Sequence, residues 1–293
     1  MSLEVAAVRP RLLSTRMGWL ARRPRTTWVH CVLVVTSVLW AFPLLLTFIS
    51  GFKSTSQQYS NPLSIPHPVV WGNFSGAWAE GDLGSAFLNS AIVTVQSVAI
   101  VLVVATLAAY ALACFNMRFG TPLLIALMVP AFVPGEVVLI PIFLMFAHLG
   151  LIDSLEGLVL ANTGGSIAIA VLLLTQFFRG VSREIIEAAT LDGATRLRVL
   201  RSVLVPLSRP ALISVGIFLM VFSWNEFFAA LILIQSPSRF TIQLAVNNYS
   251  TAYATNYGYQ SAALAIATIP PLLFFLLFQK HFSPSIGMRR GRG

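Results

Sequence analysis

The stretch EAATLDGATRLRVLRSVLVPLSRP, from Glu187 to Pro210, interrupts an otherwise apolar sequence with acidic and arginine side chains. The chain as a whole is 57% hydrophobic and only 10% charged, whereas a soluble domain carries roughly 25% charged residues. So few charges cannot cover a water-facing surface, and the composition predicts an integral membrane protein. The charged stretch is then expected to lie in water beside the membrane.

A helix–turn–helix elbow is predicted for this stretch. REIIEAATLD forms a first helix, which Ser182 caps and which Asp192 and Gly193 end. ATRLRVLRSVLV forms a second helix, which Pro206 and Pro210 end before the next apolar run. The expected apolar stripe of this second helix consists of Leu197, Leu200, Val203 and Leu204. From the residues alone, the elbow is either a docking surface for another protein or an amphipathic loop held by anionic lipid.

Six apolar runs are long enough to cross a bilayer as helices, which requires roughly 20 residues each. Because lipid offers no partner to backbone N–H and C=O groups, and the runs are too continuously apolar for barrel strands, we expect all of them to be helical. The runs are Trp28–Phe52, Leu88–Phe115, Thr121–Leu149, Gly157–Phe178, Ala211–Ile234 and Tyr259–Gln279. The sequence therefore predicts an all-α integral membrane fold with six transmembrane helices.

The basic residues predict the orientation, because lysine and arginine concentrate on the cytoplasmic side of membrane proteins. All but two of the 19 fall in the two tails or in alternate connections, so both termini and the elbow are predicted to be cytoplasmic. Lys53 and Arg239 lie on the other side, where Lys53–Ala86 is expected to form a cap with little regular structure. The predicted parts are a basic N-tail at 1–27, a six-helix domain at 28–280 with a cytoplasmic loop at 180–210, and a basic C-tail at 281–293.

The elbow resembles the EAA loop of ABC importer permeases, whose pattern is Glu-Ala-Ala, two further residues, Asp-Gly-Ala, and later an apolar residue followed by proline. The residues that match in order and spacing are Glu187, Ala188, Ala189, Asp192, Gly193, Ala194 and Val205-Pro206. The stretches SWNEFFAALIL, VPGEVVLIPIFLMFAHLGLIDSLEGLVL and FLNSAIVTVQSVAIVLVVATLAAYALA resemble the carbohydrate-importer permeases, specifically the maltose-type second permease. The chain departs from that family in its Arg-rich N-terminus and in its last residues, SIGMRRGRG.

This resemblance implies a type I ABC importer permease fold, in which the elbow is a coupling helix that fits a cleft on an ATPase subunit. Glu187 would be the polar anchor in that cleft, Ala188 and Ala189 would permit close approach, and Gly193 would make the turn. The implied partners are a second homologous permease, two cytoplasmic ATPase subunits and an extracytoplasmic solute-binding protein. Closure of the ATPase pair would switch the permease from an inward-facing to an outward-facing state.

No catalytic, cofactor or metal site is predicted in this chain. SGFKST lacks the G-x-x-x-x-G-K-[ST] pattern of a phosphate-binding loop, and Cys31 and Cys114 belong to no Cys/His cluster. The protein is therefore expected to be a transport subunit rather than an enzyme, with ATP and magnesium bound on the partner ATPase. The net charge of +9 follows the membrane topology, so lipid is an expected partner and nucleic acid is not.

Two carboxylates, Glu136 and Glu226, fall inside predicted spans. Intramembrane carboxylates are costly unless they are paired or hydrated, so they predict a polar translocation cavity. Trp224 and Asn225 adjoin Glu226 and would offer a sugar an apolar ring face and an amide. The alternative is that Asn225 and Glu226 bond to a neighbouring helix or to a partner permease, while Trp224 packs in the protein core.

The polar segment QSPSRFTIQLAVNNYSTAYATNYG precedes the last span. It resembles a family loop that reaches into the binding protein, with Asn256, Tyr257 and Gly258 near its tip.

The predicted function is the transmembrane permease subunit of an ATP-driven, binding-protein-dependent sugar importer in a bacterial-type plasma (inner) membrane. One alternative is an ion-coupled secondary transporter, in which Glu136 and Glu226 bind protons or sodium. Another is a permease of the same fold for a non-sugar solute, such as a polyamine or a phosphate ester. The sequence does not identify the sugar, because specificity in the family usually resides in the separate binding protein.

Overall fold

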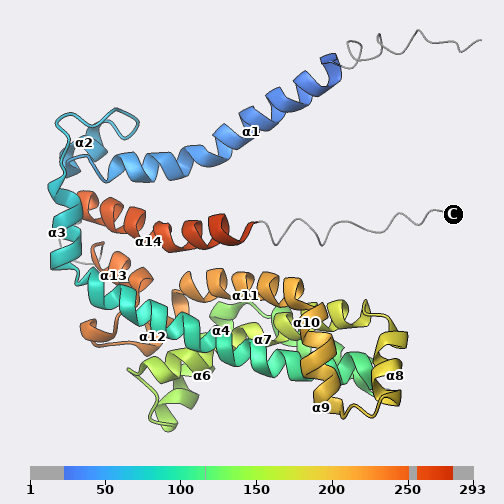
Figure 1. The fold of residues 1–293 in the computed structure, drawn as a ribbon. Coiled ribbons are helices and arrows are strands. Elements are labelled where there is room, and N and C mark those ends of the chain that lie inside the picture. The colour runs from blue at the N-terminus through green and yellow to red at the C-terminus, as the bar shows by residue number, and fades with distance from the viewer. Residues whose placement is uncertain (1–22, 116, 251–255, 280–293) are drawn as a thin grey trace, which may run out of the picture. The chain divides into compact units, whose positions relative to one another are not determined.

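The computed structural model describes residues 23–115, 117–250 and 256–279, and all regular elements among these residues are helical (Figure 1). The long helices are α1 (Arg23–Ser50), α4 (Leu83–Cys114), α7 (Leu155–Arg179), α11 (Arg209–Trp224) and α14 (Tyr257–Phe278). The shorter elements are α2 (Thr55–Ser60), α3 (Gly72–Glu80), α5 (Gly120–Met128), η1 (Val129–Phe132), α6 (Gly135–His148), α8 (Arg183–Leu191), α9 (Arg196–Val199), η2 (Leu200–Leu204), α10 (Val205–Leu207), α12 (Phe228–Leu233), η3 (Pro237–Arg239) and α13 (Ile242–Asn248). The chain divides after Thr47 into two compact units, of which the first contains most of α1 and the second contains all the other elements.

Four helices of the described chain are long and apolar enough to cross a membrane, namely α1 from Thr27 onward, α4, α7 and α14. A fifth span results if Arg196–Leu207 and Arg209–Trp224, which meet at an angle of 77°, are counted together. The all-helical prediction is confirmed. The predicted third and fifth spans are each divided into two shorter helices, so helix length alone does not give six spans.

The predicted third span, Thr121–Leu149, divides into α5 and α6 around the 3-10 segment η1. Pro130 lies at the start of η1, and Pro134 directly precedes α6. Proline has no N–H group to donate and restricts the residue before it to extended conformations, so a continuous α-helix is disfavoured here. Val133 has the expected extended backbone, with φ −90° and ψ 124°.

The segment Lys53–Ala86 is more regular than predicted, because it contains α2, α3 and the first turn of α4. Lys53 itself is fully buried, and its Nζ donates a hydrogen bond to the Pro62 carbonyl at 2.6 Å. The Asn73 amide donates to the carbonyls of Gly51 and Lys53 at 2.9 and 2.8 Å. These bonds satisfy backbone groups that a structureless cap would leave to water.

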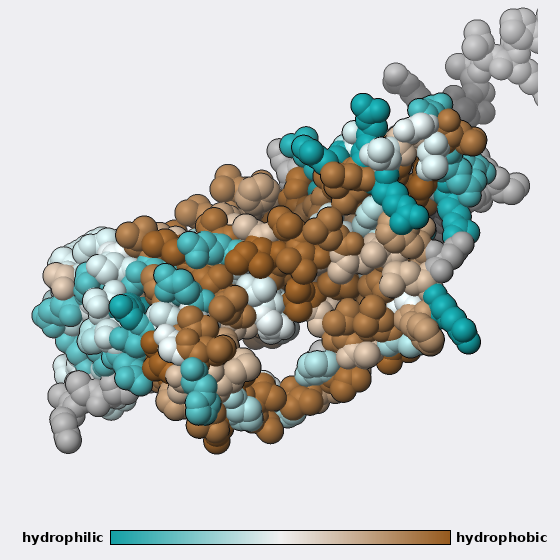
Figure 2. Space-filling view, turned by 90° about the horizontal axis from the view of Figure 1, so that it is seen from below, coloured by the Kyte–Doolittle hydropathy of each residue, from teal (hydrophilic) through white to brown (hydrophobic). Residues whose placement is uncertain are grey.

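The main core lies where α4 packs along α7 and α11. Small residues allow the helices to approach closely, and Ala105, Ala109 and Ala170 are fully buried between them. A second core at the α3 end of α4 joins α3, α13 and α14 around Ala77, Ile242 and Ala262. Large apolar side chains such as those of Leu107 and Ile140 remain exposed, and hydrophobic surface covers the middle of the face in Figure 2. Such a surface suits lipid or a partner helix.

Candidate functional site

The elbow has the predicted helix–turn–helix form, with α8 followed by a tight turn and α9. Gly193 forms the turn with a left-handed backbone, φ +80°, which glycine adopts without steric cost. The side chain of Thr195 caps α9 by accepting from the N–H of Arg198 at 3.4 Å. Ser182 precedes α8 as predicted, but its side chain accepts no capping hydrogen bond. The predicted cap is therefore correct in position and wrong in its bonding.

The second helix of the elbow continues through Pro206 to Leu207. Pro206 alone does not end the helix; the sharp bend lies at Ser208, between the two prolines that were predicted to end it. The π-helical segment η2 ends two residues before Pro206, whose ring would collide in a regular α-helix with the carbonyl four residues earlier. Leu200 and Leu204 of the predicted apolar stripe are buried, but Leu197 is 58% exposed and Val199 is buried in its place.

The motif residues of α8 divide between a buried and an exposed face. Glu187 and Ala188 are exposed, whereas Ala189 packs against the main core. Leu191, in the last turn of α8, is 89% exposed although it is apolar. An apolar side chain so exposed beside the Gly193 turn is typical of a surface that another protein covers.

Contacts with the end of α4 hold the elbow in place. The Tyr110 hydroxyl donates to the carbonyl of Arg196 at 2.9 Å. The Arg196 guanidinium lies over the ring of Phe115, 4.7 Å from its centroid, and Phe115 meets Tyr110 edge to face at 5.0 Å. These three side chains join α9 to α4, so a displacement of the elbow would be transmitted to a long helix of the main core.

Trp224 is the last residue of α11, and Asn225 and Glu226 follow it in the break before α12. Trp224 is only 5% exposed and donates from Nε1 to the carbonyl of Ala267 in α14 at 3.1 Å. The two carboxylate oxygens of Glu226 accept from the N–H groups of Ala229 and Ala230 at 2.7 and 3.1 Å. Glu226 therefore caps α12, while Trp224 packs α11 against α14.

Asn225 differs from its two neighbours because it is exposed at the break. Its Oδ1 accepts from Nε2 of Gln243 on α13 at 3.4 Å, and its Nδ2 donates to the carbonyl of Val221 at 2.8 Å. Glu136, the remaining predicted cavity residue, is the second residue of α6, directly after the break at Pro134. Glu136 and Glu226 thus each follow a break in a predicted span along the chain.

Asn256, Tyr257 and Gly258 lie at the start of α14. The side-chain oxygen of Asn256 accepts from the N–H of Tyr259 at 3.2 Å and from the Thr55 hydroxyl at 3.3 Å. The ring of Tyr257 meets that of Tyr59 edge to face at 4.8 Å. Gly258 is buried against Asn73, so closely that a Cβ atom would lie 2.8 Å from the amide. These residues form the base of the connection whose residues 251–255 lie outside the described chain.

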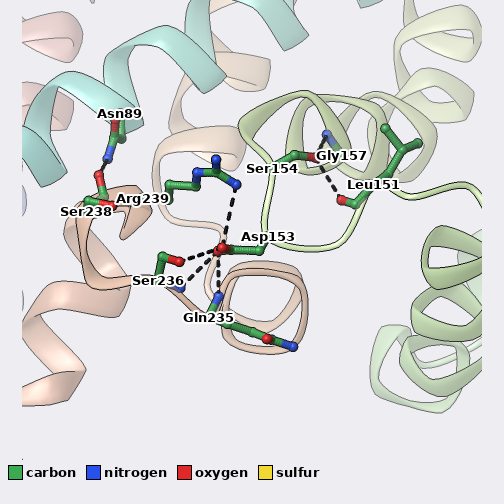
Figure 3. A network of polar contacts seen from close by, with 9 residues as sticks. All are labelled: Asn89, Leu151, Asp153, Ser154, Gly157, Gln235, Ser236, Ser238 and Arg239. Carbon is green, nitrogen blue, oxygen red and sulfur yellow. Dashed lines mark hydrogen bonds and ion pairs between the residues drawn. The ribbon is translucent and has the colours of Figure 1, made fainter.

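A polar network joins the α6–α7 turn to the segment after α12 (Figure 3). The carboxylate of Asp153 accepts from the N–H groups of Gln235 and Ser236 at 3.0 and 2.9 Å and from the Ser236 hydroxyl. Arg239 forms an ion pair with the same carboxylate at 3.5 Å. The hydrogen bonds from Ser236 and Gln235, together with Arg239, lower the pKa of Asp153 to about 2.

On the other side of the same segment, the Asn89 amide donates to the carbonyls of Ser238 and Phe240, both at 3.0 Å. The segment is therefore fixed both to α4 and to the α6–α7 turn.

Sequence reasoning did not identify Asp153, Tyr110 or Gln243 as site residues. Asp153 carried one signal, because it is a charged residue in a short turn between two apolar runs. Tyr110 and Gln243 carried none, because their partners lie 86 and 18 residues away in the sequence. Within the part of the chain that the structure describes, no group of three His, Cys, Asp or Glu residues could hold a metal ion.

Two solved structures that resemble this fold are of ABC transporters. A bacterial ABC transporter involved in the import of the acidic polysaccharide alginate matches with a TM-score of 0.76 at 20% identity, over 91% of this chain and 100% of the matched chain. A bacterial alginate ABC transporter in complex with an alginate pentasaccharide-bound periplasmic protein matches with a TM-score of 0.67 at 13% identity, over 91% of this chain and 98% of the other. At these identities the likeness concerns the fold.

Curated relatives are similar over most of their length. The diacetylchitobiose uptake system permease protein NgcG of Streptomyces coelicolor is 29% identical over 88% of this chain and 86% of NgcG. The multiple sugar-binding transport system permease protein MsmG of Streptococcus mutans is 30% identical over 87% of this chain and 92% of MsmG. Residues 117–288, which include the elbow, the helix break and the start of α14, match a protein family directly. The chain belongs to the family described as the binding-protein-dependent transport system inner membrane component.

Proposed function

We propose that this chain is one of two permease subunits of an ATP-driven, binding-protein-dependent sugar importer, and that it forms half of the translocation path. Family membership supports a role in binding-protein-dependent transport. The relatives NgcG and MsmG are named as permeases for diacetylchitobiose and for multiple sugars, which supports a sugar as the solute. The observation that carries the mechanism is the exposed elbow, which presents motif residues on a rigid turn outside the apolar core.

The proposed topology has six membrane crossings with both termini in the cytoplasm of a bacterial cell. The crossings are α1, α4, the broken pair α5–α6, α7, the broken pair α11–α12, and α14. The basic residues support this orientation, because those of the elbow and both tails then share the cytoplasmic side. Arg239, which pairs with Asp153, would lie on the external side.

The elbow is proposed to dock into a cleft on one of two cytoplasmic ATPase subunits. Glu187 would anchor it by hydrogen bonds, and the small side chain of Ala188 would permit close approach. Asp192, Gly193 and Ala194 would form the turn. ATP and magnesium would be bound by the ATPase subunits, because this chain carries no phosphate-binding loop. Closure of the ATPase pair would move the elbow, and the contacts of Tyr110 and Phe115 with Arg196 would carry that movement into α4.

An external solute-binding protein is proposed as the partner on the opposite face, and a second, homologous permease would complete the path. The similarity in fold to a bacterial alginate ABC transporter in complex with an alginate pentasaccharide-bound periplasmic protein supports this arrangement. Asn256, Tyr257 and Gly258 are proposed to position the connection that contacts the binding protein. Their packing against Thr55, Tyr59 and Asn73 supports a rigid base for that connection.

The decisive test reverses the charge of Glu187. In the complex co-expressed with its partner subunits, Glu187→Lys should abolish co-purification of the ATPase and ATP-dependent sugar uptake, while the amount of permease in the membrane stays unchanged. Glu156→Lys makes the same charge change at the other end of the molecule and should leave ATPase co-purification intact. Normal ATPase association and uptake in Glu187→Lys would refute the coupling role.

An ion-coupled mechanism makes a different prediction. It requires available carboxylates in the membrane, and one of its two candidates, Glu226, already uses both oxygens to accept backbone hydrogen bonds. Under the ATP-driven mechanism, uptake into vesicles that contain the whole complex should persist with an uncoupler as long as ATP is supplied. Collapse of uptake under these conditions would favour the ion-coupled alternative.

A further inference from the structure

One face of α11 remains uncovered and ends at the helix break. Phe218 and Phe222 lie four residues apart on this face, and each is 45% exposed. Their rings are stacked, with centroids 6.4 Å apart and an angle of 21° between the ring planes. Asn225 follows at the next helical position and is also exposed. Val215 and Leu219, on the adjoining stripe of the same helix, are buried in the main core.

Asn225 and Gln243 form a pair of amides at the end of this aromatic face. Nε2 of Gln243 donates to Oδ1 of Asn225 at 3.4 Å. Gln243 is held in place because the N–H of its neighbour Ile242 donates to the Ser90 hydroxyl on α4 at 2.8 Å. Among the described residues, no group donates to the Gln243 side-chain oxygen. The pair therefore retains capacity for hydrogen bonds with a ligand.

The chemistry of this surface is neutral. The nearest carboxylate in the sequence, Glu226, uses both oxygens to cap α12. Trp224 is buried and bonded to Ala267, so it cannot stack on a ligand in this conformation. What remains is a pair of apolar ring faces followed by two amides. A carbohydrate has the complementary chemistry, because its C–H face packs on aromatic rings and its hydroxyls exchange hydrogen bonds with amides.

We propose that Phe218, Phe222, Asn225 and Gln243 form a contact track for an uncharged carbohydrate passing along α11. The inference rests on the proposed function and specifies which side chains of this subunit meet the sugar. The sequence favoured Trp224 and Glu226 as residues that contact the sugar. The proposed contacts are instead Phe218 and Phe222 of α11 and Gln243 of α13, together with Asn225. A purely lipid-facing surface is disfavoured by the amides, because polar side chains exposed to lipid are costly.

The test uses the complete complex, reconstituted into ATP-loaded vesicles with its binding protein outside. The probes are radiolabelled maltose, cellobiose and diacetylchitobiose, and the variants are assayed with a disaccharide that the wild-type complex imports. Phe218→Leu and Phe222→Leu keep an apolar side chain that lipid would accept but remove the flat ring. Gln243→Ala removes one amide. Phe42→Leu on α1, where the phenylalanine is 48% exposed, and Gln235→Ala are the matched controls.

We expect each of the three track variants to lower the uptake rate about tenfold, which is the scale of one lost ring contact or hydrogen bond. ATP hydrolysis stimulated by the loaded binding protein should stay within about twofold of wild type, because the elbow is untouched, and both controls should transport normally. Wild-type uptake in both phenylalanine variants would assign this face to lipid and overturn the proposal. Loss of complex assembly or of stimulated ATP hydrolysis together with uptake would assign the residues a structural role and overturn it equally. If the wild-type complex imports no solute with ATP, the proposed function itself has failed.

Discussion

The elbow at Arg183–Leu207 and the helix break around Glu226 both place polar residues in an apolar chain, but they use them in opposite ways. The elbow turns Glu187 outward and buries apolar side chains such as Leu204 behind it. The break turns the Glu226 carboxylate back onto its own backbone, where it caps α12. A charged residue in such a chain therefore serves either a partner or the local fold, and hydrogen bonds distinguish the two roles.

The largest expected effect comes from breaking the turn of the elbow at Gly193. Proline fixes φ near −65°, whereas Gly193 has φ +80°, so Gly193→Pro cannot preserve the turn. We expect it to abolish ATP-dependent uptake in reconstituted vesicles and to release the ATPase during purification, with membrane insertion unchanged.

Gly193→Asn is the matched control, because asparagine tolerates the left-handed conformation better than other residues, and it should retain most uptake. Equal loss in both variants would mean that the absence of a side chain, rather than the backbone conformation, is what the site requires.

The elbow was the most predictable part of the molecule because its signals are local. Helix-forming residues, Asp192 and Gly193 together predict the turn before any tertiary contact is considered. The sequence did not predict correctly which side chains of the second helix are buried. Val199 is buried and Leu197 is exposed, and the π segment η2 that follows them departs from the regular spacing of 3.6 residues.

At the helix break, Glu226→Ala should remove the cap from α12. Losing a capping acceptor costs about 0.5–2 kcal/mol, so the melting temperature of the purified complex should fall by a few degrees. Glu226→Gln keeps one acceptor oxygen, and we expect it to retain uptake with a smaller loss of stability. Abolished uptake in Glu226→Gln at wild-type stability would show that the carboxylate has a transport role beyond the cap.

The candidate path was harder to predict than the elbow because its contacts are distant in sequence. SWNEFF contains the residues expected of a sugar site, yet Trp224 bonds to Ala267, and of Trp224, Asn225 and Glu226 only Asn225 is exposed. The residue types indicated a sugar site. The direction in which each side chain points, however, depends on packing against α13 and α14, which follow later in the chain. The six spans were predicted from the length of each apolar run. Proline disfavours a continuous helix, and Pro134 directly precedes α6, so the predicted third span is divided.

A smaller effect is expected where the elbow meets α4. Tyr110→Phe removes the hydroxyl that donates to the Arg196 carbonyl, at a cost of about 0.5–1.5 kcal/mol. Amide hydrogen exchange within Arg196–Leu207 should accelerate, and less sugar should be imported per ATP hydrolysed. Thr36→Val removes an exposed hydroxyl whose hydrogen bonds stay within α1, and it should leave both measurements unchanged. Unaltered exchange in Tyr110→Phe would mean that this hydrogen bond does not hold the elbow.

The smallest effect near neutral pH is expected at Asp153, which, like Glu226, accepts backbone hydrogen bonds. Because its pKa is lowered from 3.8 to about 2 in the folded protein, the network stabilises the fold above pH 3.8 and is lost as the pH falls through about 2. After correction for the intrinsic pH dependence of exchange, protection of the Gln235 and Ser236 amides should thus be constant between pH 5 and 8. Asp153→Asn should lower that protection throughout the range, because a neutral amide accepts more weakly than a carboxylate and loses the ion pair with Arg239. If protection of these two amides in the wild-type protein fell between pH 8 and 5, the pKa of Asp153 would lie far above 2. Asp153 would then not form the proposed network.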